Sequence, residues 1–130
     1  MKNFWLTMVF SLVVQLTFAS AFDDSLLDKA RKCYDNKEYA VAIDYFEQYI
    51  KTTTNSDLKN VYIEMANCYF KLKDNKMAVY TVIEAITDFG FSEEDFVYNQ
   101  VIDPELSKYA LSVVYEDLEQ KEKQYLATIE

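Results

Sequence analysis

The sequence lacks histidine and contains very little glycine or proline. Its 130 residues include one glycine, one proline and no histidine. Without histidine there is no Ser-His or Cys-His nucleophile pair, and the common zinc ligand sets are incomplete. One glycine is too few for a glycine-rich phosphate loop, and no calcium loop with its central glycine is present. We therefore expect a protein that is not an enzyme and that uses no cofactor or metal.

The scarcity of glycine and proline also leaves little room for β-turns, so we expect an all-α fold. Apolar residues recur at spacings of three and four, which is typical of amphipathic helices. Gly90 is a good C-terminal stop for a helix. The first helices are expected over residues 24–36, 39–51, 58–72 and 76–89.

Beyond Gly90 the pattern changes, and two further helix starts are recognisable. Ser92-Glu93-Glu94-Asp95 has the form of a capping box, which predicts a short helix to about Val101. Asp103-Pro104 combines an N-cap acid with proline at the first helical position. Residues 106–113 then resemble the start of another helical unit, and residues 115–128 are expected to form a closing helix with a wet outer face.

The N-terminal segment has the features of a secretory signal peptide. Lys2 supplies a positive start, residues 3–18 are mostly apolar, and Ala19-Ser20-Ala21 is a small-x-small cleavage site. An uncleaved anchor is the alternative, but the apolar stretch is shorter than the ~20 residues that a spanning helix needs. We expect cleavage after residue 21, a mature chain that begins at Phe22 without membrane insertion, and a periplasmic or extracellular location.

The charge of the mature chain limits its partners. Without Lys2 it has 12 basic and 22 acidic residues, a net charge of −10. Such a chain repels phosphate backbones and anionic lipid, so neither nucleic acid nor a membrane surface is expected as a partner. A basic partner is compatible with this charge, but a solvated, soluble surface is the more common explanation of such charge runs. Residues 22–130 have the length of a single domain.

Two cysteines in an exported protein raise the question of a disulfide. Cys33 and Cys68 fall at nearly equivalent places on two helices that are expected to be neighbours. Packed helices lie ~8–10 Å apart, whereas a disulfide needs Cα atoms ~4.4–6.8 Å apart. The sequence leaves open whether they pair or whether each is a small buried apolar residue.

Two stretches of the chain are similar to each other at a shift of 36 residues, which is typical of a repeat architecture. Alanine recurs at the same positions in both copies, as do apolar residues around it. The aligned positions are Leu26, Ala30, Cys33, Ala42, Phe46 and Ile50, which match Tyr62, Ala66, Tyr69, Ala78, Val82 and Ile86.

This spacing resembles the tetratricopeptide repeat, a helix-turn-helix unit of about 34 residues. The second copy supplies Tyr62-x2-Met65-Ala66-x2-Tyr69 followed by Ala78-x3-Val82, and the first copy is similar. Lys37 and Lys73 replace the usual turn glycine, and Thr54 and Gly90 stand where proline is expected. The resemblance implies an α-α superhelix with two full repeats (about 23–56 and 59–90) and degenerate C-terminal capping helices over 91–130.

The resemblance also implies a peptide groove lined by the first helix of each repeat. Arg31, Asn67 and Lys71 would bond a peptide backbone or carboxylate, and Tyr34 and Phe70 would supply apolar anchors. Alternatively, these residues are the solvent-side flank of their helices, or the C-terminal helices fill the groove. The full set of expected groove residues is Leu27, Arg31, Tyr34 and Asp35 in the first repeat, and Ile63, Asn67, Phe70 and Lys71 in the second.

Two functions therefore remain open. The first is an exported, non-catalytic interaction module that binds a protein or peptide on its repeat face. The second is a structural or assembly subunit that packs against copies of itself or against a larger envelope or secreted complex. The sequence does not specify the partner or the oligomeric state.

Overall fold

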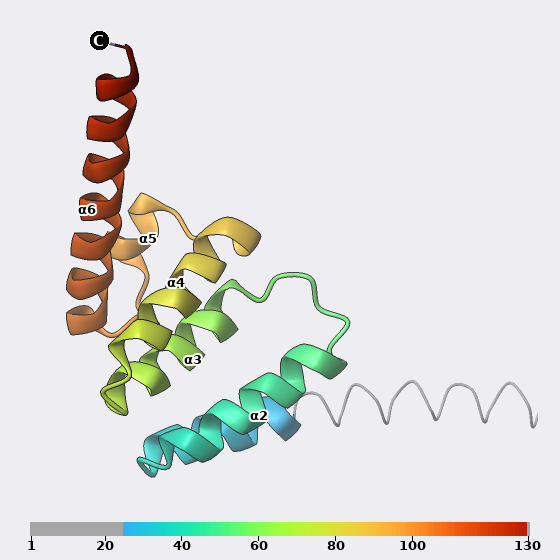
Figure 1. Ribbon diagram of the computed structural model, residues 1–130. Coiled ribbons are helices and arrows are strands. Elements are labelled where there is room, and N and C mark those ends of the chain that lie inside the picture. Colours follow the sequence, from blue (N-terminus) through green and yellow to red (C-terminus); the bar gives the residue numbers. More distant parts are fainter. Residues whose placement is uncertain (1–24, 130) are drawn as a thin grey trace, which may run out of the picture. The chain divides into compact units, whose positions relative to one another are not determined.

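The protein is all-α in the part that the structure describes. The computed structural model describes residues 25–129, which contain helices, turns and no strand (Figure 1). The expected signal peptide, residues 1–21, lies outside these residues. The chain divides into two compact units, one ending at Thr54 and the other beginning at Asn55. The predicted stacking of the two repeats into a superhelix concerns the arrangement of these units and stays a prediction.

The first unit is a helical hairpin. Residues 25–35 are helical, and α2 (Tyr39–Thr52) follows after a short turn. Ala30 and Ala42 are completely buried, as expected for small residues that allow two helices to approach closely. The buried apolar residues recur at helical spacing on both segments: Leu26, Ala30, Ala42, Ile43, Phe46 and Tyr49.

The second unit contains four helices. A hairpin of α3 (Lys59–Lys71) and α4 (Asn75–Phe89) is followed by the short α5 (Glu93–Tyr98) and the long α6 (Pro104–Ile129) (Figure 1). Ala66, Ala78 and Ala85 are fully buried. They belong to one core cluster, which also contains Ile63, Val79, Val82, Phe91, Ile102, Leu106 and Ala110.

The C-terminal part differs from the expected pair of segments, because α6 is a single helix of 26 residues. No glycine or proline occurs between Glu105 and Ile129, so nothing in the sequence ends the helix near Val113. Its start is as expected: Asp103 Oδ1 accepts hydrogen bonds from the backbone N–H groups of Glu105 (2.9 Å) and Leu106 (3.3 Å). Ile129 is therefore on the same rigid helix as the core residues Leu106 and Ala110.

The other two predicted helix boundaries are also present. Gly90 ends α4 in the left-handed conformation at φ 69°. Ser92 and Asp95 form the capping box at the start of α5, where an Asp95 carboxylate oxygen accepts from the Ser92 backbone N–H at 2.8 Å. The Ser92 backbone donor, together with the Ser92 hydroxyl and Lys59, lowers the pKa of the Asp95 carboxyl below its ordinary value. Asp95 therefore stays charged where it caps the helix.

The turns of the two hairpins have the same backbone geometry at a shift of 36 residues. Lys37 and Lys73 both adopt positive φ, at 63° and 65°. In the first turn Glu38 N–H donates to Cys33 O, and in the second Asp74 N–H donates to Tyr69 O. Lys37 and Lys73 donate in turn to Tyr34 O and Phe70 O, each at 3.0 Å. This pairing is the Schellman motif, whose left-handed residue is usually glycine. The sequence repeat is thus also a repeat of local structure.

We expect Lys73→Gly to stabilise the protein. A left-handed conformation is unfavourable for any residue with a Cβ, and glycine removes this cost at the loss of some chain entropy. The free energy of unfolding should rise by about 0.5–1 kcal/mol in urea denaturation. Lys108→Gly, within exposed helix α6, is the matched control and should lower it by about 1 kcal/mol. If Lys73→Gly lowers stability as much as Lys108→Gly, the turn is not strained.

Candidate functional site

One face of α3 carries the groove residues that were predicted for the second repeat. Ile63, Asn67 and Lys71 follow one another at spacings of four residues, so they form a single stripe along the helix. Asn60 extends the stripe by one turn. In the structure this face is covered by the segment of residues 92–109, which includes α5, the connection to α6 and the start of α6 (Figure 1). We call this covered face the α3 stripe.

Asn67 binds the backbone of the connection between α5 and α6 with both ends of its side chain. Its amide nitrogen donates to the Val101 carbonyl oxygen at 2.8 Å, and its amide oxygen accepts from the Asp103 backbone N–H at 2.9 Å. The side chain is nearly fully buried, with 5% of its residue surface exposed. Because buried polar groups are costly when unpaired, both bonds are needed for this arrangement to be stable. Asn67 thus binds a non-helical backbone segment of its own chain.

Lys71 contacts the residue that precedes α6, and Phe70 contacts α6 itself. Lys71 Nζ lies 3.2 Å from a carboxylate oxygen of Asp103. Burial raises the pKa of the Asp103 carboxyl, but the backbone donors at Glu105 and Leu106 and the ammonium group of Lys71 outweigh burial and lower it below its ordinary value. The ring of Phe70 packs against the ring of Tyr109 with centroids 6.3 Å apart. The Asn67 side-chain amide, the Lys71 ammonium group and the Phe70 ring therefore all contact residues 101–109.

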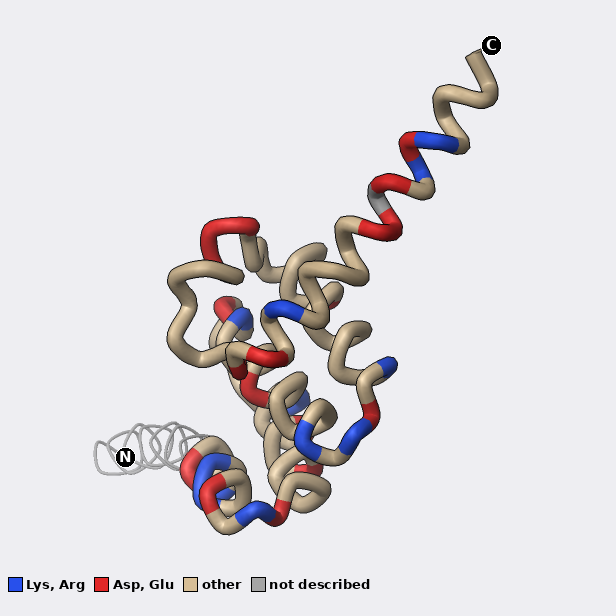
Figure 2. Tube along the Cα trace, turned by 90° about the vertical axis from the view of Figure 1, so that its left-hand side faces the viewer, with Lys and Arg blue, Asp and Glu red and all other residues tan. Residues whose placement is uncertain are grey.

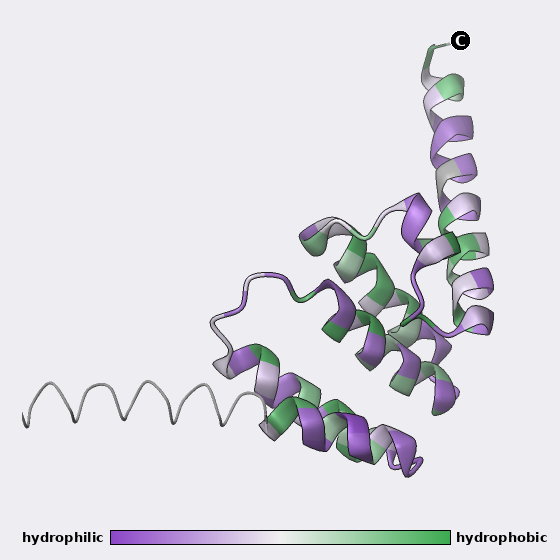
Figure 3. Cartoon of the chain, turned by 180° about the vertical axis from the view of Figure 1, so that it is seen from behind, coloured by the Kyte–Doolittle hydropathy of each residue, from purple (hydrophilic) through white to green (hydrophobic). Residues whose placement is uncertain are grey.

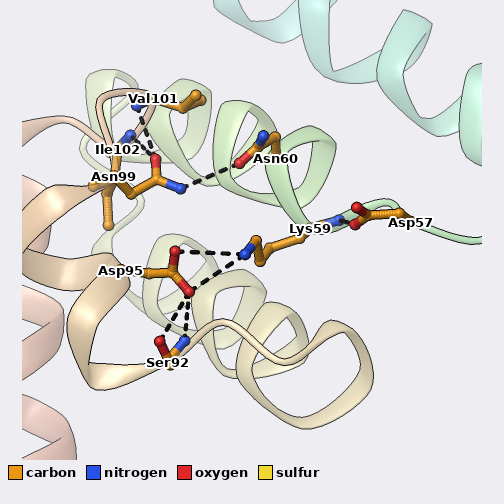
Figure 4. A network of polar contacts seen from close by, with 8 residues as sticks. All are labelled: Asp57, Lys59, Asn60, Ser92, Asp95, Asn99, Val101 and Ile102. Carbon is orange, nitrogen blue, oxygen red and sulfur yellow. Dashed lines mark hydrogen bonds and ion pairs between the residues drawn. The ribbon is translucent and has the colours of Figure 1, made fainter.

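A second group of polar contacts holds α5 to the start of α3 (Figure 4). Lys59 Nζ lies 3.4 Å from both carboxylate oxygens of Asp95. Asn99 donates from its amide nitrogen to Asn60 at 3.2 Å, and its amide oxygen accepts from the backbone N–H groups of Val101 and Ile102. These contacts are partly exposed, so each contributes modestly to stability. Together with Asn67 they fix residues 92–103 on α3 at several points.

The predicted groove residues are therefore placed as follows. Asn67, Phe70 and Lys71 lie together and make the kinds of contact expected of them, but to residues 101–109 of the same chain. Ile63 is completely buried in the core cluster, so the expectation that it lines an open groove needs correction. The same cluster includes Leu106 and Ala110 of α6, which no repeat pattern specifies. For α3 alone, this arrangement is the one expected if the C-terminal helices fill the groove, whereas the groove across both repeats stays a prediction.

The four groove residues of the first repeat belong to the other unit. Leu27 and Tyr34 are half-buried, and Arg31 and Asp35 are exposed. The ring of Tyr34 meets the ring of Tyr39 edge to face at 5.4 Å, so it packs against α2 of its own hairpin. Tyr34 is thus partly engaged in the hairpin rather than fully available to a ligand.

An apolar pocket lies elsewhere in the second unit, between α4, the start of α5 and α6. It has a volume of about 170 Å³ and is open to solvent. Phe91 and Phe96 form one wall, with their rings at 88° and 4.9 Å apart. The Tyr115 hydroxyl donates to a Glu93 carboxylate oxygen at 2.9 Å, which places one polar pair at the pocket. The lining residues are Ile86, Phe91, Glu93, Phe96, Leu111, Val114 and Tyr115.

The sequence reasoning missed this pocket. Its residues come from three helices that no single periodic pattern connects. The available signal was the pair of phenylalanines that follow Gly90, at the point where the repeat pattern is lost. Aromatic residues beyond the end of a repeat indicate additional packing, but the partners of Phe91 and Phe96 depend on the path of α6.

The two cysteines carry free thiols. Cys33 is half-buried in the first unit, and Cys68 is completely buried on α3. Burial raises the pKa of the Cys68 thiol to about 12, so it stays protonated at neutral pH and behaves as a small apolar residue. Among residues 25–129, no three Cys, Asp or Glu side chains are grouped so that they could hold a metal ion. None of the helices described combines the length and the apolar character needed to cross a bilayer.

Comparison of the chain with family models, curated proteins and solved structures gives no match.

We expect Asn67→Ala to destabilise the second unit by about 2 kcal/mol, because two buried backbone groups lose their partner. The loss should appear in urea denaturation. Hydrogen exchange at the Asp103 amide should also become faster, since that N–H donates to Asn67. Asn60→Ala removes a single exposed contact, so it is the matched control and should change stability by less than 0.5 kcal/mol. Equal effects of the two variants would show that the buried amide is not what holds this segment.

Proposed function

We propose that this protein is a non-catalytic interaction module of the tetratricopeptide-like kind that binds a protein partner through the apolar pocket of its second unit. The observation that carries the proposal is a solvent-open pocket of about 170 Å³ that is lined mainly by Ile86, Phe91, Phe96, Leu111 and Val114. Apolar cavities of this size accept a benzene-sized group, so a single aliphatic or aromatic side chain matches it. Apolar anchors of this kind contribute most of the binding energy at protein interfaces.

The position of the pocket supports this choice over the α3 stripe. A partner at the α3 stripe would have to displace residues 92–109, with the buried contacts of Asn67 and the ion pairs of Lys59 and Lys71. A partner at the pocket displaces only solvent. Tyr115, which lines the pocket from α6, is 52% exposed.

The proposal includes a location outside the cytoplasm, which rests on the signal peptide expected over residues 1–21. A protein that only displays a binding surface needs no cofactor, and the lack of histidine is consistent with that. The measurement is the intact mass of the protein purified from its native host, which should begin at Phe22. A mass that includes Met1, or one that starts within residues 3–18, would contradict the proposed cleavage.

We expect the pocket to bind an isolated apolar side chain weakly but specifically. When N-acetyl-phenylalanine amide is titrated into the processed chain, methyl NMR signals of Ile86, Leu111 and Val114 should shift at millimolar concentrations. The methyl groups of Val41, which is 43% exposed on α2, provide the internal control and should not respond.

Val114→Phe is the variant that tests the site, because its larger side chain fills the pocket. It should reduce the shifts at Ile86 and Leu111 at least fivefold, whereas Val41→Phe should leave them unchanged. Equal shifts in the wild type and Val114→Phe, or no shifts even in a monomeric form of the chain, would overturn the pocket as a binding site.

Assembly with copies of itself is a second candidate, and the C-terminal half of α6 favours it. Tyr125, Leu126 and Ile129 are 65%, 48% and 64% exposed near the end of a helix that extends past α3, α4 and α5 (Figure 1). Exposed apolar residues that cluster on one element are typical of an interaction surface.

A further inference from the structure

The C-terminal half of α6 is a helix whose apolar residues have no cover in the described chain. Every described side chain from Tyr115 to Ile129 is exposed. Polar residues dominate this half, and apolar segments return near the end marked C (Figure 3). Two ion pairs, Lys121 with Asp117 and Lys123 with Glu119, support the helix at spacings of four residues. The helix is thus well supported locally but presents Tyr125, Leu126 and Ile129 to solvent.

These exposed residues lie on the same face of α6 as the pocket residues. Leu111 and Ile129 are separated by 18 residues, which is five helical turns. Val114 and Tyr125, and likewise Tyr115 and Leu126, are separated by 11 residues, or about three turns. The wall of the pocket therefore continues as an apolar face along the free part of the helix, interrupted by Glu122.

The charges beside this face match a second, antiparallel copy of the same helix. Along one flank Asp117 precedes Lys121, and along the other Glu119 precedes Lys123. Red and blue segments accordingly alternate toward the end marked C (Figure 2). When two such helices pair antiparallel, each flank lies against the same flank of the other copy, which runs in the opposite direction. An acidic residue of one copy then lies near a lysine of the other. In a parallel pair, acids would face acids.

The apolar residues match in the same antiparallel register. If the pair is centred on Gln120, residues equally far from Gln120 lie at the same level. Leu111 is nine residues before it and Ile129 is nine residues after it, so the second copy's Ile129 lies beside Leu111 at the pocket. The second copy's Tyr125 then lies beside Tyr115, and its Leu126 lies beside Val114. In this register each acid lies within two residues, or about 3 Å along the helix, of the level of the lysine on the same flank of the second copy, so the charge pattern is compatible with it.

We propose that a second copy of this chain is the occupant of the pocket: two α6 helices pair antiparallel, and the Ile129 end of each fills the pocket of the other. The arrangement is a closed two-fold dimer in which each copy completes the site of its partner. This proposal rests on the pocket proposed above as the binding site and names its partner. Glu122 interrupts the contact, so we expect a dimer that dissociates at low micromolar concentrations.

The first experiment measures the mass of the processed chain by sedimentation equilibrium between about 1 and 500 µM. The wild type should change from monomer to dimer over this range. Leu126→Asp with Ile129→Asp should raise the dissociation constant more than tenfold, while circular dichroism shows an unchanged helix content. Val41→Asp with Leu72→Asp is the matched control, because these residues are also exposed and apolar but lie outside α6. It should leave the dimer intact.

A charge exchange tests the antiparallel register. Lys121→Glu with Lys123→Glu makes both flanks acidic and should abolish the dimer. Adding Asp117→Lys and Glu119→Lys reverses every charge and restores opposite signs across the pair, so the fourfold variant should dimerise again. A dimer that persists in the Leu126→Asp, Ile129→Asp variant, or failure of the fourfold variant to recover while it stays helical, would overturn the proposal.

The outcome separates this proposal from the function on which it rests. If the wild type stays monomeric at 500 µM while N-acetyl-phenylalanine amide still shifts the pocket methyl signals, the second copy is excluded and the pocket remains a site for another partner. If the amide binds only to the monomeric Leu126→Asp, Ile129→Asp variant, the pocket of the wild type is occupied by its own copy, as proposed. If neither dimer nor amide binding occurs, both proposals are wrong.

Discussion

The buried side-chain amide of Asn67 is the interaction on which the arrangement of the second unit depends. Its two bonds hold the connection between α5 and α6 against α3 and so set where α6 begins. The start of α6 then brings Leu106 and Ala110 into the core, and the next turns bring Leu111 and Val114 to the pocket. The buried Ser107 adds a second polar contact, because its hydroxyl donates to the Phe96 carbonyl oxygen and so joins the start of α6 to α5. Polar groups in cores are well suited to this role because only one arrangement satisfies them.

The α3 stripe contacts residues 101–109 of its own chain through the kinds of group that were expected to contact a bound peptide. Asn67, Lys71 and Phe70 supply an amide, a cation and an aromatic ring. Residues 101–109 supply the backbone groups, the Asp103 carboxylate and the Tyr109 ring that they contact. Because the polar groups of the α3 stripe are paired within the chain, this face stabilises the fold and is not open to a partner. The proposed binding therefore uses a different surface, the pocket between α4, α5 and α6.

The fold could be predicted from the sequence wherever local rules decide the structure. Helix periodicity, Gly90, the capping box at Ser92 and the Asp103-Pro104 start all depend on residues within a few positions of one another, and all are present. The buried alanines followed from the repeat. The length of α6 was missed because two expected segments were read where nothing ends the helix. Ile63 was misplaced because its environment depends on α6, which lies more than 40 residues away in the sequence.

The unbroken length of α6 has a mechanical consequence. At 1.5 Å per residue, its 26 residues make a rod of about 39 Å that carries the pocket wall near one end and Ile129 at the other. Since the rod has no hinge within it, a tilt of about 10° at Asp103 would carry its tip sideways by about 7 Å. A small change in the orientation of the first turn of α6 therefore produces a larger displacement of its C-terminal end, so the helix acts as a lever.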